Sequence, residues 1–368
     1  MSRLETDVLI AGGGPAGLSA AIAARQHGLR VVVADLSRPP IDKACGEGLM
    51  PDSLAALAQL GVSLDQAETG IFRGIRFLGQ GNSVEALFPN GIGRGIRRTL
   101  LHAALIERAT EAGASLRWNT RVEIRNGSIT LNGEPVRYKW LIGADGNESR
   151  IRRFARLDVG SAYQRRIGIR RHFRVRPWTD LVEIYWGKDC QAYVTPIAGD
   201  QVCVALIARK KVDFEQAAAQ FPALMRHLES GSFLSGVRGA ITLSRRLPAV
   251  TSGNVALIGE ASGSADAITG EGLAMCFRQA VALGKALAAA DLSLYERAHR
   301  KIMRLPQMMG RAMLLMDQNR WVRDRSLRAL SARPEIFDRM LSIHVGALPI
   351  TQFGLNTAAN FGWQMLTA

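Results

Sequence analysis

The sequence has few of the residues that build disulfide scaffolds or metal centres. Its 368 residues include only four cysteines, and no two of them form a CxxC pair. This spacing argues against a disulfide framework and against a cysteine-rich zinc or iron–sulfur site. The six histidines show no ligand spacing such as HxxxH, so we predict no metal site. Such sparse, scattered cysteines fit the reducing cytoplasm.

Long apolar runs and aromatic residues are also scarce. No segment supplies the roughly 20 apolar residues that cross a bilayer, and the uncharged residues 8–24 are interrupted by four glycines and a proline. Aromatic residues make up 6% of the chain and no basic low-complexity arm is present, which argues against a stacking platform for nucleic acid. We therefore expect no nucleic-acid partner, and contact with a membrane at its surface at most.

Negative charge is in deficit. The chain has 47 Lys and Arg residues against 32 Asp and Glu residues, a net charge of +15, and only seven of the 47 are lysines. Two interpretations of this arginine excess stay open. One is a compositional bias that favours solubility, and the other is attraction to an anionic cofactor, an acidic protein or a membrane surface.

What the chain does contain is a complete βαβ unit near its start. Residues 7–11 are an apolar run of strand length, and residues 12–17 read GGGPAG, which supplies a G-x-G-x-x-G turn. An alanine-rich helix is predicted over residues 18–26, and a second, β-branched strand over residues 29–34 closes on Asp35. Strand, glycine turn, helix and acid in this order indicate dinucleotide binding.

Each glycine of the turn has a geometric task in such a unit. Gly12 permits the tight turn, Gly14 lets the backbone approach a pyrophosphate, and Gly17 lets helix and strand pack closely. The free N–H groups at the helix start then face the phosphates. Asp35 is expected to accept hydrogen bonds from the ribose hydroxyls.

Two later segments bear on which dinucleotide is bound. Residues 138–146 form a strand that ends in Asp-Gly and opens a D-G-x-x-S-x-x-R pattern at a helix start. Residues 254–260 form another strand that ends in Gly-Glu. After a short loop, Thr-Gly-Glu-Gly at residues 269–272 opens a long helix.

In this order, the three motifs resemble the superfamily of FAD-dependent aromatic hydroxylases (group A monooxygenases) and geranylgeranyl reductases. The resemblance implies an α/β fold with a Rossmann-type FAD-binding domain. It also implies that Glu260 contacts the ribityl chain, although the family usually has aspartate there. The helix behind Gly270 and Gly272 would direct its N-terminus at the flavin and stabilise negative charge on it.

The resemblance also places an arginine on the phosphate or ribityl side of FAD. Residues 95–102 begin a helix, and Arg98 aligns with that position better than Arg97 does; a solvated helix-start arginine is the alternative. The predicted cofactor-binding residues are Gly12, Gly14, Pro15, Ala16, Gly17, Asp35, Cys45, Gly46, Arg98, Asp145, Gly259, Glu260, Gly270 and Gly272.

Two residues are candidates for catalysis. Residues 43–51 resemble the C-G-x-G-L segment of geranylgeranyl reductases, which lies by the flavin, so Gly46 would let the backbone approach the ring. Cys45 is a candidate proton donor or redox thiol, with a packing role as the alternative. Residues 192–196 lie where reductases and flavin halogenases carry a tryptophan-bearing segment, but no tryptophan is present. Tyr193 is a pocket candidate there, or a core aromatic.

The expected organisation has three parts. Residues 1–70, 92–155 and 248–290 form the discontinuous FAD-binding domain. Residues 71–91 and 156–247 form a β-rich substrate domain, with an antiparallel sheet and one amphipathic helix over residues 213–228. Residues 291–368 form a C-terminal helical extension punctuated by its prolines. Its basic faces are solvated, or they dock on anionic lipid or an acidic partner.

The sequence thus predicts an FAD-dependent oxidoreductase acting on an apolar or aromatic small molecule. A hydroxylase (monooxygenase) and a double-bond reductase, each driven by NAD(P)H, stay equally open. No second G-x-G-x-x-G is present, so NAD(P)H would bind without its own Rossmann domain, or electrons come from another donor. The alternative is an electron-transfer flavoprotein that passes electrons to a quinone or protein partner at a membrane surface.

Overall fold

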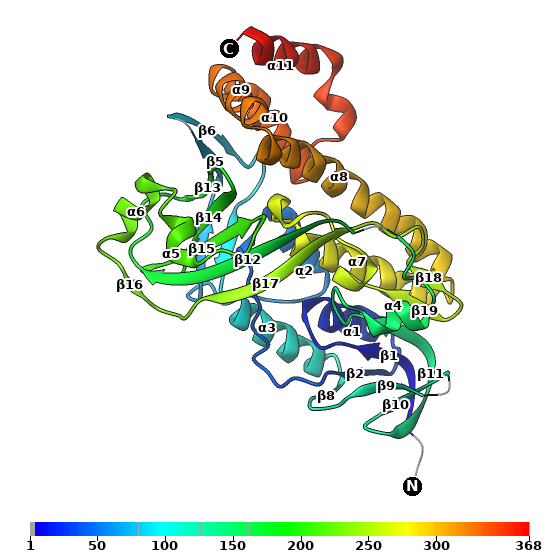
Figure 1. Cartoon of the computed structure of the whole chain (residues 1–368). Coiled ribbons are helices and arrows are strands. Elements are labelled where there is room, and N and C mark those ends of the chain that lie inside the picture. Colours follow the sequence, from blue (N-terminus) through cyan, green and yellow to red (C-terminus); the bar gives the residue numbers. More distant parts are fainter. Residues whose placement is uncertain (1–3, 80, 126, 161, 368) are drawn as a thin grey trace.

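A largely parallel sheet organises the first lobe of the molecule (Figure 1). The computed structural model describes residues 4–79, 81–125, 127–160 and 162–367. The strands of this sheet are β1 (Leu4–Ala11), β2 (Val31–Ala34), β8 (Ser115–Arg117), β9 (Val122–Arg125), β10 (Ser128–Leu131), β11 (Glu134–Gly143), β18 (Thr251–Ser252) and β19 (Val255–Leu257). Its main path runs β18-β19-β11-β1-β2-β8, with β1 parallel to both β2 and β11. The predicted Rossmann-type fold class is confirmed.

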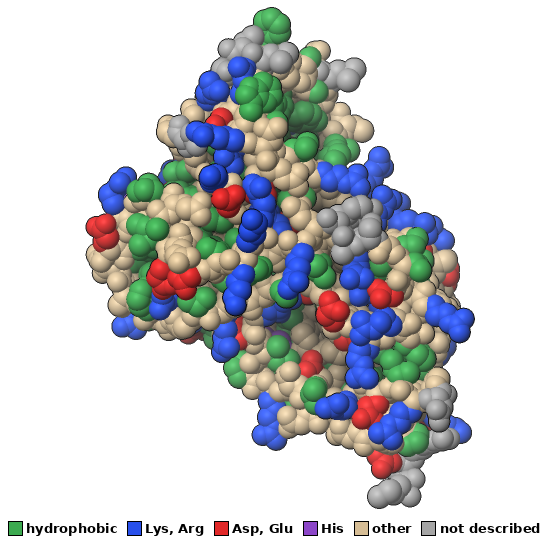
Figure 2. All heavy atoms as spheres, in the orientation of Figure 1, with side chains coloured by type: hydrophobic (Ala, Val, Ile, Leu, Met, Phe, Trp, Pro, Cys, Tyr) green, Lys and Arg blue, Asp and Glu red, His purple; other side chains and the backbone are tan. Residues whose placement is uncertain are grey.

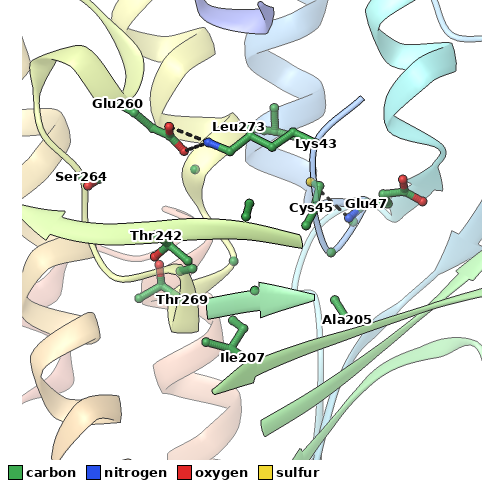
Figure 3. Close-up of a pocket in the computed structure, with 18 of the residues that line it drawn as sticks. Lys43, Cys45, Glu47, Ala205, Ile207, Thr242, Glu260, Ser264, Thr269 and Leu273 are labelled. Atoms are coloured by element: carbon green, nitrogen blue, oxygen red, sulfur yellow. Dashed lines mark hydrogen bonds and ion pairs between the residues drawn. The ribbon is translucent and has the colours of Figure 1, made fainter. Parts of the chain in front are cut away.

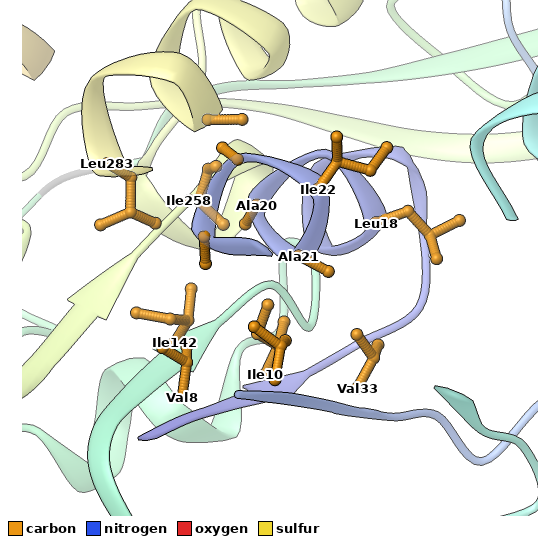
Figure 4. Packing of buried hydrophobic residues seen from close by; sticks show 14 of the residues in the cluster. Val8, Ile10, Leu18, Ala20, Ala21, Ile22, Val33, Ile142, Ile258 and Leu283 are labelled. Atoms are coloured by element: carbon orange, nitrogen blue, oxygen red, sulfur yellow. The ribbon is translucent and has the colours of Figure 1, made fainter. Parts of the chain in front are cut away.

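The helices of the first lobe pack closely because their contact residues are small. They are α1 (Pro15–Gln26), α2 (Pro51–Gln59), α3 (Arg98–Glu111), α4 (Arg150–Phe154) and α7 (Gly272–Ala288), with the short turns η1 (Gly259–Ser262) and η2 (Ala267–Thr269). Figure 4 shows Ala20 and Ala21 of α1 above Ile10 of β1. A Cβ added at Gly284 of α7 would lie 2.9 Å from the Cβ of Ala23 in α1, so the absence of a side chain lets the two helices touch.

A second sheet forms the other lobe. Its strands are β5 (Gly74–Gly79), β6 (Asn82–Leu87), β12 (Ala162–Arg174), β13 (Leu181–Trp186), β14 (Cys190–Ile197), β15 (Gln201–Ala208), β16 (Ser232–Phe233) and β17 (Arg238–Arg245). Their order is β16-β12-β15-β14-β13-β5-β6, with β17 also paired to β12. The sheet is antiparallel as predicted except between β13 and β5, which run parallel. A third, three-stranded sheet consists of β3 (Gly48–Leu49), β4 (Thr69–Phe72) and β7 (Gly93–Ile96), and it contacts both β14 and α2.

Two expectations about helices were wrong in detail. The single helix predicted over residues 213–228 is two helices, α5 (Phe214–Ala218) and α6 (Pro222–Leu228). The break has a local cause, because Pro222 lacks an N–H and begins a helix rather than continuing one. Pro306 does not interrupt the extension: it lies inside the continuous helix α8 (Leu292–Gln318) and is buried.

The rest of the extension consists of α9 (Arg320–Ala332), α10 (Pro334–His344), the turn η3 (Ile350–Phe353) and α11 (Leu355–Thr367). These helices lie at the end of α8 that is remote from the first lobe, beside β5 and β6 (Figure 1). Phe337 of α10 packs on Phe77 of β5, with ring centroids 4.7 Å apart. Among the described residues, no helix combines the length and the apolar character needed to cross a bilayer.

Candidate functional site

A cavity of about 390 Å³ lies where the first lobe meets the sheet of the second. Figure 3 shows Lys43, Cys45 and Glu260 on one side and Ala205, Ile207 and Thr242 on the other. Of the predicted site residues, those that line the cavity are Gly14, Pro15, Ala16, Cys45, Gly46, Arg98, Tyr193, Gly259, Glu260, Gly270 and Gly272. Gly12, Gly17, Asp35 and Asp145 do not line it.

In the glycine turn, Gly12 and Gly17 lie against other backbone atoms, whereas Gly14 borders open space. A Cβ at Gly12, whose φ is +112°, would lie 2.4 Å from the carbonyl oxygen of Ala144, and a Cβ at Gly17 would lie 1.8 Å from the carbonyl oxygen of Gly12. A Cβ at Gly14 would meet nothing within 4 Å. The backbone at Gly14 therefore borders open space at the start of α1, as a site for a phosphate requires.

Asp35 and Asp145 order the backbone behind the cavity. Asp35 accepts hydrogen bonds from the backbone N–H groups of Gly13 and Ser37, each at 2.7 Å. Asp145 accepts from Ser149 Oγ at 2.5 Å and from the backbone N–H of Arg150 at 2.7 Å. Asp145 thus holds the start of α4, whose N-cap residue is Ser149. A contact of either carboxylate with the cofactor stays a prediction.

Arg98 presents an unused donor to the cavity. Its backbone N–H donates to Glu47 Oε1 at 3.0 Å, which fixes the start of α3. Its side-chain Nε is buried and has no hydrogen-bond partner among the described residues. A buried N–H group of a guanidinium without an acceptor is costly, and an anionic ligand in the cavity would supply that acceptor.

The late Gly-acid segment faces the same cavity. Gly259 has a φ of +62°, and a Cβ there would lie 2.7 Å from the Cβ of Ala16, so this turn and the first glycine turn meet. Glu260 accepts from Lys43 Nζ at 2.7 Å with both carboxylate oxygens (Figure 3). No local pattern in the sequence points to this pair, whose members are 217 positions apart.

The segment that carries Cys45 is held by a buried acid next to it. Glu47 is 2% exposed and has a φ of +59°, a conformation that is sparse for residues other than glycine. Arg97 and Arg170 both donate to His172 Nδ1, at 3.1 and 3.0 Å. His172 Nε2 therefore carries the proton and donates to Glu47 Oε2 at 2.6 Å.

Glu47, His172 and Cys203 also place three ligand-type atoms within 4.8 Å of one another. Arg170 Nε lies 3.7 Å from Glu47 Oε1. Because this guanidinium already balances the carboxylate, a cation in the cluster would meet a positive charge at close range. The cluster is better described as an anchor for the Cys45 segment than as a metal site.

Tyr193 belongs to the apolar wall. Its hydroxyl donates to the backbone carbonyl of Ile268 at 2.7 Å, and its side chain is 7% exposed. Burial raises the pKa of this phenol, so it keeps its proton. Phe72, Ile184 and Ile207 line the cavity with it, and together they favour an apolar ligand.

Two buried charged groups near the cavity were not predicted. Arg166 is fully buried and contacts Asp266 at 3.3 Å and Asp317 at 3.4 Å, which joins β12 to η2 and to the end of α8. Glu271 at the N-cap of α7 is 1% exposed, and its Oε2 lies 3.7 Å from His344 Nδ1. Burial raises the pKa of Glu271 to about 8 and lowers that of His344 to about 4.

The residues at the cavity fit FAD. The open backbone at Gly14 and the unpartnered Arg98 Nε suit its phosphates. The N-terminus of α7, beside Gly270 and Gly272, has no side-chain cap and suits the electron-rich edge of a flavin.

Comparison with known proteins agrees with this assignment. A family model described as "FAD binding domain" matches residues 5–300. The menaquinone reductase of Mycolicibacterium smegmatis is 28% identical over 303 residues, 73% of each chain. The digeranylgeranylglycerophospholipid reductase of Thermoplasma acidophilum is 27% identical over 307 residues, which cover 74% of this chain and 75% of that protein.

Among solved structures, a flavoprotein/dehydrogenase from Cytophaga hutchinsonii superposes with a TM-score of 0.78 at 18% identity, over 93% of each chain. This likeness supports the fold. The family match, the order of the motifs and the donors around the cavity all lead to one assignment. The chain belongs to the FAD-binding family and is an FAD-dependent oxidoreductase of the aromatic hydroxylase and geranylgeranyl reductase superfamily.

Proposed function

We propose that the protein reduces a carbon–carbon double bond in the isoprenoid chain of a lipid, with NAD(P)H as electron donor. The observation that carries this proposal is the position of Cys45, which lines the cavity between the FAD-holding turns and the apolar strands. The names of the two relatives agree with it, because menaquinone and digeranylgeranylglycerophospholipids are both lipids with isoprenoid chains.

The chemistry that bound FAD supplies is the transfer of a hydride. The chain's own residues provide the other half of the reaction. Addition across a double bond also needs a proton, and the Cys45 thiol is the donor that we propose for it. Its Sγ accepts the backbone N–H of Glu47 at 3.4 Å, which holds it at the cavity wall. The apolar side chains around Tyr193 exclude water and hold the lipid chain.

The test begins with the purified protein loaded with FAD. Under anaerobic conditions, NADPH and then NADH are added while the visible flavin band is followed, and bleaching identifies the donor. Menaquinone or geranylgeranyl lipid is then added and the products are analysed by mass spectrometry. The proposal predicts a product that has gained two hydrogens, and the Cys45→Ser variant should form it much more slowly at equal flavin content.

Other products would point to the other candidates. A product that has gained an oxygen atom, formed only in air, would identify a hydroxylase and contradict the proposal. A flavin that NADPH and NADH leave oxidised, even with lipid present, but that an electron-transfer protein reduces would identify an electron carrier. Steep loss of that reaction with added salt would fit docking through the arginines.

A lipid substrate also requires access to a membrane, and we propose that the C-terminal helices provide it. Trp321, Trp363 and Ile350 are 54%, 65% and 43% exposed, and residues 339–368 contain no acidic residue. Figure 2 shows apolar side chains over this end of the molecule with Lys and Arg beside them. Co-sedimentation with vesicles that contain anionic lipid, but not with neutral vesicles, would support this contact.

A further inference from the structure

A second, smaller cavity adjoins the main one. Its volume is about 70 Å³, and it lies between the end of β17, residues 264–266 and the middle of α8. Three of its ten lining residues are arginines, namely Arg245, Arg246 and Arg311. Residues 264–266 line both cavities, so the two cavities adjoin at this short segment.

One acidic residue, Asp266, lines this cavity, and a buried arginine outside the cavity wall balances its charge. Asp266 is 4% exposed and accepts from Arg166 at 3.3 Å, from Ser244 Oγ at 2.9 Å and from the backbone N–H of Ile268 at 3.0 Å. Arg166 is fully buried and also contacts Asp317, which pairs with Arg209 at 3.1 Å as well, so two guanidinium groups balance these two carboxylates. The residues that line the cavity therefore include no further carboxylate that could neutralise its three arginines.

The arginines keep unused donors. Arg245 NH1 donates to Asp158 at 2.8 Å, but Asp158 also accepts from Arg152 at 2.7 Å, so one carboxylate serves two guanidinium groups. Arg245 Nε is buried and has no hydrogen-bond partner among the described residues. Arg246 and Arg311 are exposed, and within the described part of the chain neither side chain makes an ion pair or a hydrogen bond.

A small, concave site with several guanidinium groups and no free acid is suited to a phosphate, whose oxygens accept forked hydrogen bonds from arginine. Gln307 and Ser264 add polar side chains to the same wall. A sulfhydryl, sugar or quinone ring would leave these charges unpaired.

We propose that the second cavity binds a phosphate group of a ligand whose apolar part occupies the main cavity. The ligand would cross residues 264–266, with its chain against the β-sheet and its phosphate between Arg246 and Arg311. This inference rests on the proposed function for the nature of the chain, an isoprenoid, and adds an anionic head to it. The same chemistry has a second source, the phosphates of the nicotinamide donor.

The test measures binding rather than turnover, so it is independent of whether the double bond is reduced. The FAD-loaded protein is titrated calorimetrically with geranyl monophosphate and with geraniol, which share the chain and differ in the phosphate. We expect geranyl monophosphate to bind about tenfold more tightly or better. In the Arg246→Ala/Arg311→Ala double variant the two ligands should bind about equally.

The matched control is Arg304→Ala, because Arg304 is also an exposed arginine on α8 but does not line the cavity. This variant should keep the full preference for the phosphate. An equal loss in the control, or a preference that survives in the double variant, would overturn the proposal and assign the effect to the general positive charge.

A third titration, with NADPH, distinguishes the two sources of phosphate. If the double variant weakens NADPH and leaves geranyl monophosphate unchanged, the cavity serves the electron donor and the substrate head is excluded from it. If it weakens only geranyl monophosphate, the substrate carries the phosphate.

Discussion

The buried acid Glu271 makes the stability of the protein depend on pH in a direction opposite to that of most carboxylates. In the folded protein burial raises its pKa from 4.5 to about 8. Among the described residues only His344 forms an ion-pair contact with the carboxylate, and His344 is itself buried and uncharged at neutral pH. Arg278 of α7 also acts on His344, and this guanidinium is paired with Asp52. At pH 7 Glu271 is therefore mostly protonated.

The size of the effect follows from proton linkage. Between pH 4.5 and about 8 the folded state keeps a proton that the unfolded state releases, so the free energy of unfolding falls as the pH rises through this window and levels off above it. Each pKa unit corresponds to about 1.4 kcal/mol, so the rise to about 8 is a loss of about 5 kcal/mol across the window. Replacing Glu271 by Gln removes the ionisable proton and keeps the shape.

The assay is urea unfolding from pH 5 to pH 8.5, with and without saturating FAD. The difference in unfolding free energy between Glu271→Gln and the wild type should grow by several kcal/mol towards alkaline pH. Glu335→Gln, at an exposed position of α10, is the control and should show no such growth. A difference that is constant with pH would refute the reasoning. Infrared spectroscopy gives a second check: the wild type should show a protonated-carboxyl band that Glu271→Gln lacks, and a wild type without this band would also refute the reasoning.

Three further substitutions test the site. Gly14→Val should fold normally but lose FAD, because its side chain would enter the open space at the start of α1; a normal flavin-to-protein ratio would contradict the assignment. Cys45→Ser should retain FAD and slow product formation, and unchanged turnover would return Cys45 to a packing role. Arg166→Met should lower the free energy of unfolding by about 3–5 kcal/mol, since it leaves the buried Asp266 without an ion-pair partner among the described residues, whereas Asp317 keeps Arg209. Chemical denaturation measures this change, and a loss below about 1 kcal/mol would show that the cluster relaxes.

The parts of the fold that the sequence predicted are those with local signals. The turn at residues 12–17 needs glycine at fixed spacing, and the structure shows why at Gly12 and Gly17, where a Cβ would overlap the backbone. The antiparallel sheet predicted for the second lobe also rests on a local signal, because its strands alternate in polarity or run apolar. The break before Pro222 was also visible locally, but the amphipathic pattern on both sides of it outweighed the proline.

The contacts that the sequence could not predict join residues far apart in the chain. Lys43 pairs with Glu260, and Glu47 with His172, 125 positions away. A charged residue in a loop has the same local pattern whether it is solvated or paired, so only the folded arrangement identifies its partner. The raised pKa of Glu271 could not be predicted for the same reason, because it comes from burial in the folded protein, where the distant His344 lies beside the carboxylate.

Part of the arginine excess has a structural role, because several arginines are buried in ion pairs. Arg152, Arg166 and Arg170 are the three largest fully buried side chains among the described residues. Arg166 and Arg170 each contact a carboxylate of a distant segment. Arg152 contacts Asp158, six positions away, and donates to the distant carbonyl of Ala261 at 3.1 Å. A guanidinium stays charged when buried and offers five donors in a fixed plane, whereas a buried lysine loses its proton readily and offers a point charge. Elements that are far apart in the sequence, such as β12 and the end of α8, are joined by such multivalent links. The arginines that remain unpaired, such as Arg246 and Arg311, are then the ones available to bind anionic ligands, and lysine at position 166 would not replace arginine there.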